Sequence, residues 1–266
     1  MTFRTSGFLS SELAPWAAET REQHKKWFGF AEEVNKLGMK VRHALQPASD
    51  SEQQLIGTLL FTRALQSFQA VILLAERGMI ADARLLARSC AETTILLGGL
   101  ATSSGFSAKL IESHYKHKLA IAQSLLADQE ARLDLTLSQI ANLESVVHAI
   151  NTEYPNKVLR EIKYEQVARD AGLLSIYNTI YRGLSGDAAH PTLDALNRHL
   201  KSDDAGNIEA TVFRPERVEL DDTLMAGVFG CLYCIEAIAK IFQSILFDTE
   251  LSSCRGKYQQ LVTAKQ

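Results

Sequence analysis

Residues 224–247 read LMAGVFGCLYCIEAIAKIFQSILF and form the most apolar segment of the chain. The segment is long enough to cross a bilayer as a helix. However, Glu236 stands at its centre, followed by Lys240 and Gln243, and each central charge costs about 2.5–3.5 kcal/mol on membrane-insertion scales. We therefore expect a buried core helix, part of a last long helix over 216–247, and no membrane span.

The composition of the whole chain also favours helix. The 266 residues include only 15 Gly and 5 Pro, whereas average usage of about 12% would give about 32 in total. A chain so poor in turn formers is expected to be mostly helical. Hydrophobic residues make up 46% and the formal net charge is -3, which excludes a disordered chain and a globally basic nucleic-acid-binding surface.

Apolar positions at helical spacing predict the organisation. We expect an all-α, bundle-like single domain over residues 1–266, with about seven to nine helices. A helical extension is expected over 1–47 and the core over 49–250. A short β-hairpin is expected near 207–214, where the pattern is least helical.

Local signals predict several helix ends. Ser49 and Glu52 have the spacing of a capping box, and Arg77-Gly78 has the cation and following glycine typical of a helix C-terminus. The helix that begins at Met79 is expected to run to about Leu100, with Gly98, Gly99 and the following Ser103-Ser104-Gly105 as the residues that break it. Gly29 and Gly38 are expected to divide the helical segment over 10–45.

The cysteines and the N-terminus indicate a compartment. The first twelve residues contain no apolar run, so no secretory signal peptide is expected. Cys231 and Cys234 lie three apart on one predicted helix face, which makes a poor structural disulfide. A reduced, cytoplasmic location is expected, with no metal site and no cofactor.

One predicted helix is locally basic. It carries Lys109, His114, Lys116, His117 and Lys118. The two histidines are three apart, but no acidic residue completes a metal-binding pattern. We interpret the run as a solvated face turned toward an anion or a partner.

The helix from Met79 carries the first polar group of interest. At 100° per residue one side of the helix is shared by Leu85, Ser89, Glu92, Thr93 and Leu96. Arg88 borders this stripe, four residues before Glu92. Arg84 precedes Arg88 by one turn. Two interpretations stay open: an Arg–Glu latch that fixes helix packing, or the floor of a polar pocket. Loss of Glu92 should cost about 3–5 kcal/mol if the pair is buried, and under about 1 kcal/mol if it is exposed.

The second polar group lies over 177–191. Tyr177, Tyr181 and Ser185 share a helical face, with Arg182 beside them and His190 directly before a proline. An arginine could hold a phosphate while a histidine acts as acid or base near pH 7. Alternatively, the histidine begins a helix and packs against the tyrosines.

Two motifs together resemble a known family. Residues 76–92 contain Leu-x-Arg-Ser-x-x-Glu after a glycine and an alanine. Residues 177–191 contain Tyr-x-x-x-Tyr-x-x-Leu-Ser and then His-Pro. Over about residues 50–250 the chain is similar to a bacterial family, domain of unknown function 5677. The resemblance implies an all-helical fold and one shared site, formed by Arg88, Glu92, Tyr181, Ser185 and His190.

The chain also resembles, more loosely, the helical ribonuclease superfamily of toxins and phage-defence proteins. That superfamily separates its arginine and histidine by four to six residues, whereas Arg182 and His190 are separated by seven, and Gly183 replaces a polar residue. This resemblance and the grouping of arginine, tyrosine, serine and histidine lead to one hypothesis, a metal-independent ribonuclease-like or nucleotide-handling protein of defence or toxin type. Its partner would be RNA, and it would assemble as a homodimer. The alternative is a non-enzymatic helical module whose polar cluster is structural or binds a partner or an anionic small molecule.

Overall fold

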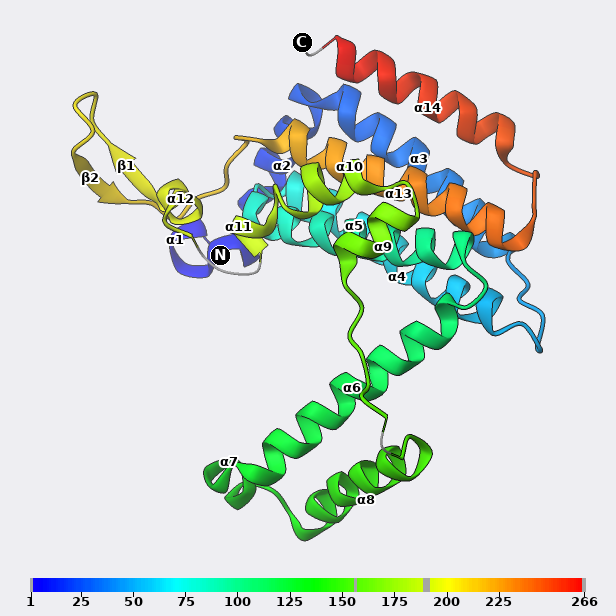
Figure 1. Ribbon diagram of the computed structural model, residues 1–266. Helices are drawn as coiled ribbons and strands as arrows, with labels where there is room; N and C mark the ends of the chain where they lie inside the picture. Colours follow the sequence, from blue (N-terminus) through cyan, green and yellow to red (C-terminus); the bar gives the residue numbers. More distant parts are fainter. Residues whose placement is uncertain (1, 156, 189–191, 265–266) are drawn as a thin grey trace. The chain divides into compact units, whose positions relative to one another are not determined.

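The structure is a computed structural model that describes residues 2–155, 157–188 and 192–264 (Figure 1). These residues are mostly helical, and their strands form one two-stranded sheet. The predicted all-α class with a short hairpin is confirmed. Helices of at least eleven residues are α2 (Leu13–Gln23), α3 (Lys25–Ala44), α4 (Glu52–Glu76), α5 (Ile80–Thr102), α6 (Phe106–Ala127), α8 (Leu137–Glu153), α13 (Leu220–Phe242) and α14 (Asp248–Thr263).

Shorter helical elements connect them. The α-helical ones are α1 (Phe3–Ser6), α7 (Gln129–Leu133), α9 (Tyr164–Asp170), α10 (Leu174–Ile176), α11 (Ser185–Ala188) and α12 (Leu193–Leu196). Two are 3-10 turns, η1 (Gly7–Leu9) and η3 (Asn197–His199), and one is a π-helical turn, η2 (Tyr177–Tyr181).

The chain divides into two compact units. Unit 1 comprises Met1–Thr102 and Tyr164–Gln266, and unit 2 comprises Ser103–Lys163. Each unit is described by itself. The single domain predicted over 1–266 stays a prediction.

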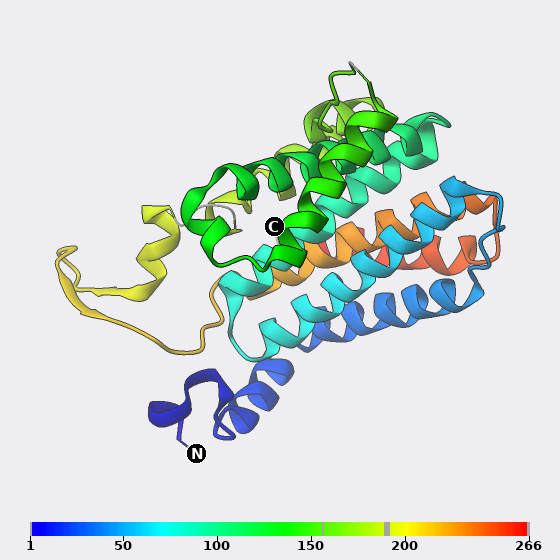
Figure 2. The same ribbon diagram turned by 90° about the horizontal axis from the view of Figure 1, so that it is seen from below.

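The core of unit 1 is built around α4, α5 and α13, which pack against one another. Helix α3 packs on α4 and α13, and α14 packs on α3 and α13 (Figures 1 and 2). Most of the largest fully buried side chains come from these helices, among them Phe61, Phe68, Ile95, Leu224 and Ile238. Burial of these apolar side chains is the main stabilising contribution.

Small side chains let α5 and α13 approach closely. A Cβ atom on Gly230 would lie 3.1 Å from the Cys90 sulfur. The Thr94 hydroxyl lies 2.8 Å from the Cys90 carbonyl oxygen and 3.1 Å from that of Gly230. All four cysteines are free and buried.

Helix α13 is the helix that the apolar segment predicts. Both α4 and α13 are long and apolar enough to cross a membrane by length and composition, but buried core helices meet the same criterion. In α13, 67% of the most apolar window is buried within the protein. The absence of a membrane span and the cytoplasmic location stay predictions.

Several predicted helix ends need correction. The cap of α4 is Ser51, which accepts from the backbone N–H of Gln54, rather than Ser49. The break between α2 and α3 falls at His24, and Gly29 and Gly38 lie inside α3. The predicted end at Gly78 is confirmed, because Gly78 has a φ of 74° directly after the α4 C-cap.

Helix α5 runs through Gly98 and Gly99 and ends at Thr102, so the predicted break falls at Ser103-Ser104-Gly105 and not at the two glycines. A Cβ atom at Gly98 would lie 2.4 Å from the Leu173 side chain. The glycine therefore allows close packing rather than a break in the helix.

The long helix predicted over 216–247 is also shorter than expected. It begins at Leu220 after Glu219, whose φ is 61°, and ends before Gln243, whose φ is 51°. Both residues adopt the left-handed conformation, which reverses the chain direction. A further helix, α14, follows in a segment for which the sequence pattern gave no prediction.

The predicted hairpin is present with a shifted first strand. Strand β1 (Leu200–Ser202) pairs antiparallel with β2 (Ile208–Thr211), with Leu200 opposite Thr211. The Asp203 carboxylate accepts from the backbone N–H of Asn207 at 2.7 Å, which stabilises the turn.

Unit 2 is a helical hairpin of α6 and α8 joined by α7. Thr136 and Gln139 form a capping box at the start of α8. The Glu112 carboxylate accepts from the Lys157 ammonium at 2.9 Å. Of the predicted basic run, Lys109, His114, His117 and Lys118 are exposed, and Lys116 forms an ion pair with Glu161 at 3.5 Å.

Candidate functional site

Arg88 and Glu92 form the ion pair that their spacing on α5 predicts. Arg88 Nη2 lies 3.2 Å from Glu92 Oε1, and the two side chains are 17% and 29% exposed. The pair is therefore neither fully buried nor fully exposed, and the cost of losing Glu92 should lie between the values of about 3–5 kcal/mol and about 1 kcal/mol expected for those two limits. One guanidinium atom, Arg88 Nε, is buried and has no hydrogen-bond partner among the described residues.

Three tyrosines stack beside this pair. The ring of Tyr181 lies between those of Tyr177 and Tyr164, at centroid distances of 5.0 and 5.7 Å and interplanar angles of 19° and 17°. The Arg88 guanidinium carbon lies 4.6 Å from the Tyr181 ring centroid, a cation–π contact. The ion pair and the stack form one group of side chains, called here the Arg88–tyrosine cluster: Arg88, Glu92, Tyr164, Tyr177 and Tyr181.

Burial perturbs two acids in the cluster. Burial raises the pKa of the Glu92 carboxyl, and the neighbouring Arg88 lowers it by less. The pKa of Tyr164 is raised by burial first, and also by Glu92 and Tyr181. Shifted acids that share a partly buried group are a marker of functional sites, although structural ion pairs shift pKa values too.

A π-helical turn positions the tyrosines. In η2 the Arg182 N–H donates to the Tyr177 carbonyl at 2.9 Å, five residues back. π-Helical turns are rare and occur frequently at functional sites. At Gly183, two residues after this turn, a Cβ atom would lie 2.2 Å from the Thr179 carbonyl oxygen, so any other residue would force the backbone to shift.

The other predicted residues of this segment lie in different surroundings. The Ser185 hydroxyl donates to the Tyr181 carbonyl at 2.6 Å. Arg182 is exposed, and none of the described hydrogen bonds or ion pairs involves its side chain. His190 lies outside the described residues, so its place in a shared site stays a prediction.

The predicted inward stripe of α5 is wrong at Leu85, which is 39% exposed. The fully covered face carries mainly small side chains instead: Ala83, Ala87, Cys90, Ala91 and Thr94. These small residues let α13 approach α5 closely, as at Gly230 and Cys90. A pattern based on large apolar residues does not detect a face of this kind.

Arg84 belongs to a second polar group. Its Nη1 atom lies 3.3 Å from Glu219 Oε1. Arg198 lies 2.7 Å from Glu216 and 3.2 Å from the other oxygen of Glu219. The two arginine side chains are only 13% and 14% exposed.

These residues line a cleft of about 560 Å³, called here the Arg84 cleft. Arg214 is the third arginine in its lining, and Gly183 and Gly186 contribute wall from the segment after the π-helical turn. The cleft and the Arg88–tyrosine cluster are linked twice, since Arg84 is one turn before Arg88 on α5 and Gly183 follows Tyr181 by two residues.

The sequence motifs locate only part of these groups. They identified Arg84, Arg88, Glu92, Tyr177 and Tyr181 but missed the residues contributed from distant segments, namely Tyr164, Arg198, Arg214, Glu216 and Glu219. No local signal marks those residues, because each acquires its role through tertiary contacts. Among the described residues, no group of three or more His, Cys, Asp or Glu side chains is arranged to hold a metal ion.

The fold and these side chains define an all-helical protein with a stacked polar cluster beside an arginine-lined cleft. The chain belongs to a family of unknown function, DUF5677, whose model matches residues 54–208. No curated protein and no solved structure matches the chain. The matched segment contains the whole Arg88–tyrosine cluster together with Arg84 and Arg198, whereas Arg214, Glu216 and Glu219 follow it.

Proposed function

We propose that this protein is a helical ligand-binding module that holds the anionic group of a small molecule in the Arg84 cleft. The observation that carries this proposal is the convergence of three arginines, Arg84, Arg198 and Arg214, on one cleft of about 560 Å³. Small-molecule sites have volumes of about 300–1,000 Å³ and few, well-placed polar groups.

The chemistry of the lining favours a carboxylate or phosphate. Three arginines against Glu216 and Glu219 give the lining a formal charge of +1. A guanidinium presents planar, paired donors that match both anions. The glutamates hold Arg84 and Arg198 in position, and Arg214 is exposed, with no ion pair to the described acidic residues.

The Arg88–tyrosine cluster acts as a positioning element in this proposal. The Arg88 side chain on α5 contacts Tyr181 in η2, and the chain that leaves η2 supplies Gly183 and Gly186 to the cleft wall. Contact between α5 and the π-helical turn therefore sets where that wall lies.

The ribonuclease-like hypothesis requires Arg182 and His190 to act on one phosphate. Because Arg182 is exposed and His190 lies outside the described residues, the described geometry adds nothing to it, and RNA as partner stays a prediction. The hypothesis is tested by incubating the parent and His190→Ala proteins with RNA. Cleavage by the parent alone would favour an enzyme.

The binding proposal is tested by calorimetric titration with inorganic phosphate and with a nucleoside monophosphate. Arg214→Gln should weaken binding about tenfold or more, because a hydrogen bond to a charged group contributes about 1.5–3 kcal/mol. Arg63→Gln, at an exposed arginine on α4, is the matched control and should bind like the parent. Absence of saturable binding in the parent, or equal binding by Arg214→Gln, would refute the proposal.

A further inference from the structure

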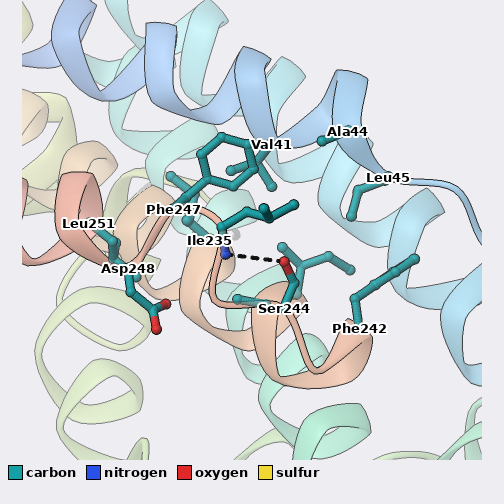
Figure 3. A pocket seen from close by; sticks show the side chains of 12 residues that line it. Val41, Ala44, Leu45, Ile235, Phe242, Ser244, Phe247, Asp248 and Leu251 are labelled. Carbon is teal, nitrogen blue, oxygen red and sulfur yellow. Dashed lines mark hydrogen bonds between the residues drawn. The ribbon is translucent and has the colours of Figure 1, made fainter.

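We propose a second binding site, for a small neutral apolar molecule, at the end of the bundle where α3 and α13 finish and α14 begins. A cavity of about 110 Å³ lies at this place, and we call it the apolar cavity. Figure 3 shows the side chains that line it. It shares no lining residue with the Arg84 cleft, so the inference does not depend on the function proposed above. Its lining comes from the end of α3, the end of α13, the turn that follows α13 and the first turn of α14.

The turn between α13 and α14 explains why a cavity forms here. Gln243 adopts the left-handed conformation, and the Ser244 N–H donates to the Ala239 carbonyl at 3.0 Å. The chain leaves the helix axis at this point, and Leu246 extends into solvent with 75% of its surface exposed. The helix end therefore does not fill the space between Val41 on α3 and Leu251 on α14.

The polar atoms of the lining do not offer a charged partner to a ligand. The Ser244 hydroxyl oxygen accepts from the Leu246 N–H at 3.4 Å. In Figure 3 the Asp248 carboxylate points away from the other labelled side chains. The remaining lining side chains are hydrocarbon, four of them almost fully buried: Val41, Ile235, Ile238 and Leu251.

These walls favour an apolar occupant over water. A bound water needs about two to four hydrogen-bond partners, whereas a cavity of about 150 Å³ lined by Leu, Ile and Phe stays dry and binds benzene. The apolar cavity is slightly smaller, at about 110 Å³, and it opens to solvent on one side, where Ala44, Leu246 and Asp248 of its lining are exposed. Its ligand class is therefore a neutral hydrocarbon about as large as benzene, either a free ring or the end of a short alkyl group.

The experiment uses the full chain with isoleucine δ1 methyl groups labelled with carbon-13, titrated with benzene. The methyl resonances of Ile235 and Ile238 should shift in a saturable way. The same methyl groups should respond to xenon, which enters dry apolar cavities. Benzene should also raise the melting temperature of the parent, because a ligand that binds only the folded state stabilises it.

Two variants fill the cavity from different walls. Ala239→Leu adds bulk from α13, and Ala44→Leu adds it from the exposed last residue of α3, where folding is not at risk. Each should weaken benzene binding at least tenfold. Ala120→Leu, at an exposed position of α6, makes the same chemical change outside the cavity and should bind like the parent.

Three results would overturn the inference. One is a parent whose Ile235 and Ile238 signals do not respond to benzene or xenon. Another is a response of equal size in the parent and in Ala44→Leu, which indicates adsorption to the surface only. The third is a linear, non-saturating shift. If Ala239→Leu fails to fold, benzene binding by the Ala44→Leu protein alone tests the proposal.

Discussion

Replacing Arg88 by alanine tests the energetic role of the Arg88–tyrosine cluster most directly. The variant loses two contacts, the ion pair to Glu92 at 3.2 Å and the cation–π contact to Tyr181 at 4.6 Å. A cation–π contact contributes about 0.5–2 kcal/mol, depending on its exposure. Removing one partner of a fully buried pair costs about 3–5 kcal/mol, and an exposed pair contributes about 0–1 kcal/mol.

Because Arg88 and Glu92 are 17% and 29% exposed, the pair lies between those limits. We expect Arg88→Ala to lower the free energy of unfolding by about 2–4 kcal/mol at pH 7. Glu92→Gln should cost less, about 1–2 kcal/mol, because burial already disfavours the charged carboxylate more than Arg88 favours it and the amide oxygen can still accept from Arg88. The double variant Arg88→Ala/Glu92→Gln should be more stable than Arg88→Ala by about 1–2 kcal/mol, since it leaves no unpaired carboxylate.

The pH dependence of Arg88→Ala follows from the same shift. A carboxyl whose pKa is raised by folding stabilises the protein fully below its unfolded pKa, and this contribution is lost as the pH rises through the folded pKa. Loss of Arg88 removes the contribution that lowers the pKa of Glu92. The destabilisation should therefore be larger at pH 7 than near the ordinary glutamate pKa of 4.5.

Urea unfolding of the four proteins at both pH values measures these differences. The reasoning is refuted if the two single substitutions are additive in the double variant, because additivity means that water screens the pair completely. It is also refuted if Arg88→Ala costs the same at both pH values.

Two further predictions concern the space around two glycines and the reactivity of the cysteines. Gly183→Ala should lower the free energy of unfolding by about 1–3 kcal/mol in a denaturant titration, because its Cβ would lie 2.2 Å from the Thr179 carbonyl oxygen. Gly256→Ala on α14, where a Cβ meets nothing within 4 Å, should stabilise by about 0.5–1 kcal/mol, and a loss at both positions would contradict the steric argument. The cysteines should not react with an aromatic disulfide reagent in the native protein, since all are buried and burial raises the pKa of the Cys231 thiol. In denaturant all 4 should react, and fast native labelling would show that α5 and α13 separate readily.

Local patterns were sufficient where a feature depends on neighbours in the sequence. The pairing of Arg88 with Glu92 follows from a separation of four residues on one helix. The stop at Gly78 follows from the need for a positive φ after a helix. Tyr177 and Tyr181 stack because one helical turn brings them together.

The same patterns misplaced features that depend on distant partners. Gly98 reads as a helix breaker, yet it lies inside α5 because Leu173 needs the space that a Cβ would occupy. Leu85 fits an inward helical stripe, but the covered face of α5 is made of small residues such as Ala87 and Cys90. In both instances the neighbouring helices decide which residue is buried or tolerated, and the helical period of the sequence carries no information about those neighbours.

Glu219 shows most clearly why the Arg84 cleft is hidden from sequence patterns. Its φ of 61° is unusual for a residue with a side chain, and a conformation of this kind costs of order 1–3 kcal/mol. Glycine or asparagine would relieve that cost. However, neither would offer a carboxylate to both Arg84 and Arg198, which lie 3.3 and 3.2 Å from its two oxygens. Backbone strain persists only where the surroundings compensate for it, and such strain clusters at binding sites. The glutamate at this position therefore indicates that holding Arg84 and Arg198 in place outweighs the cost of the strained backbone.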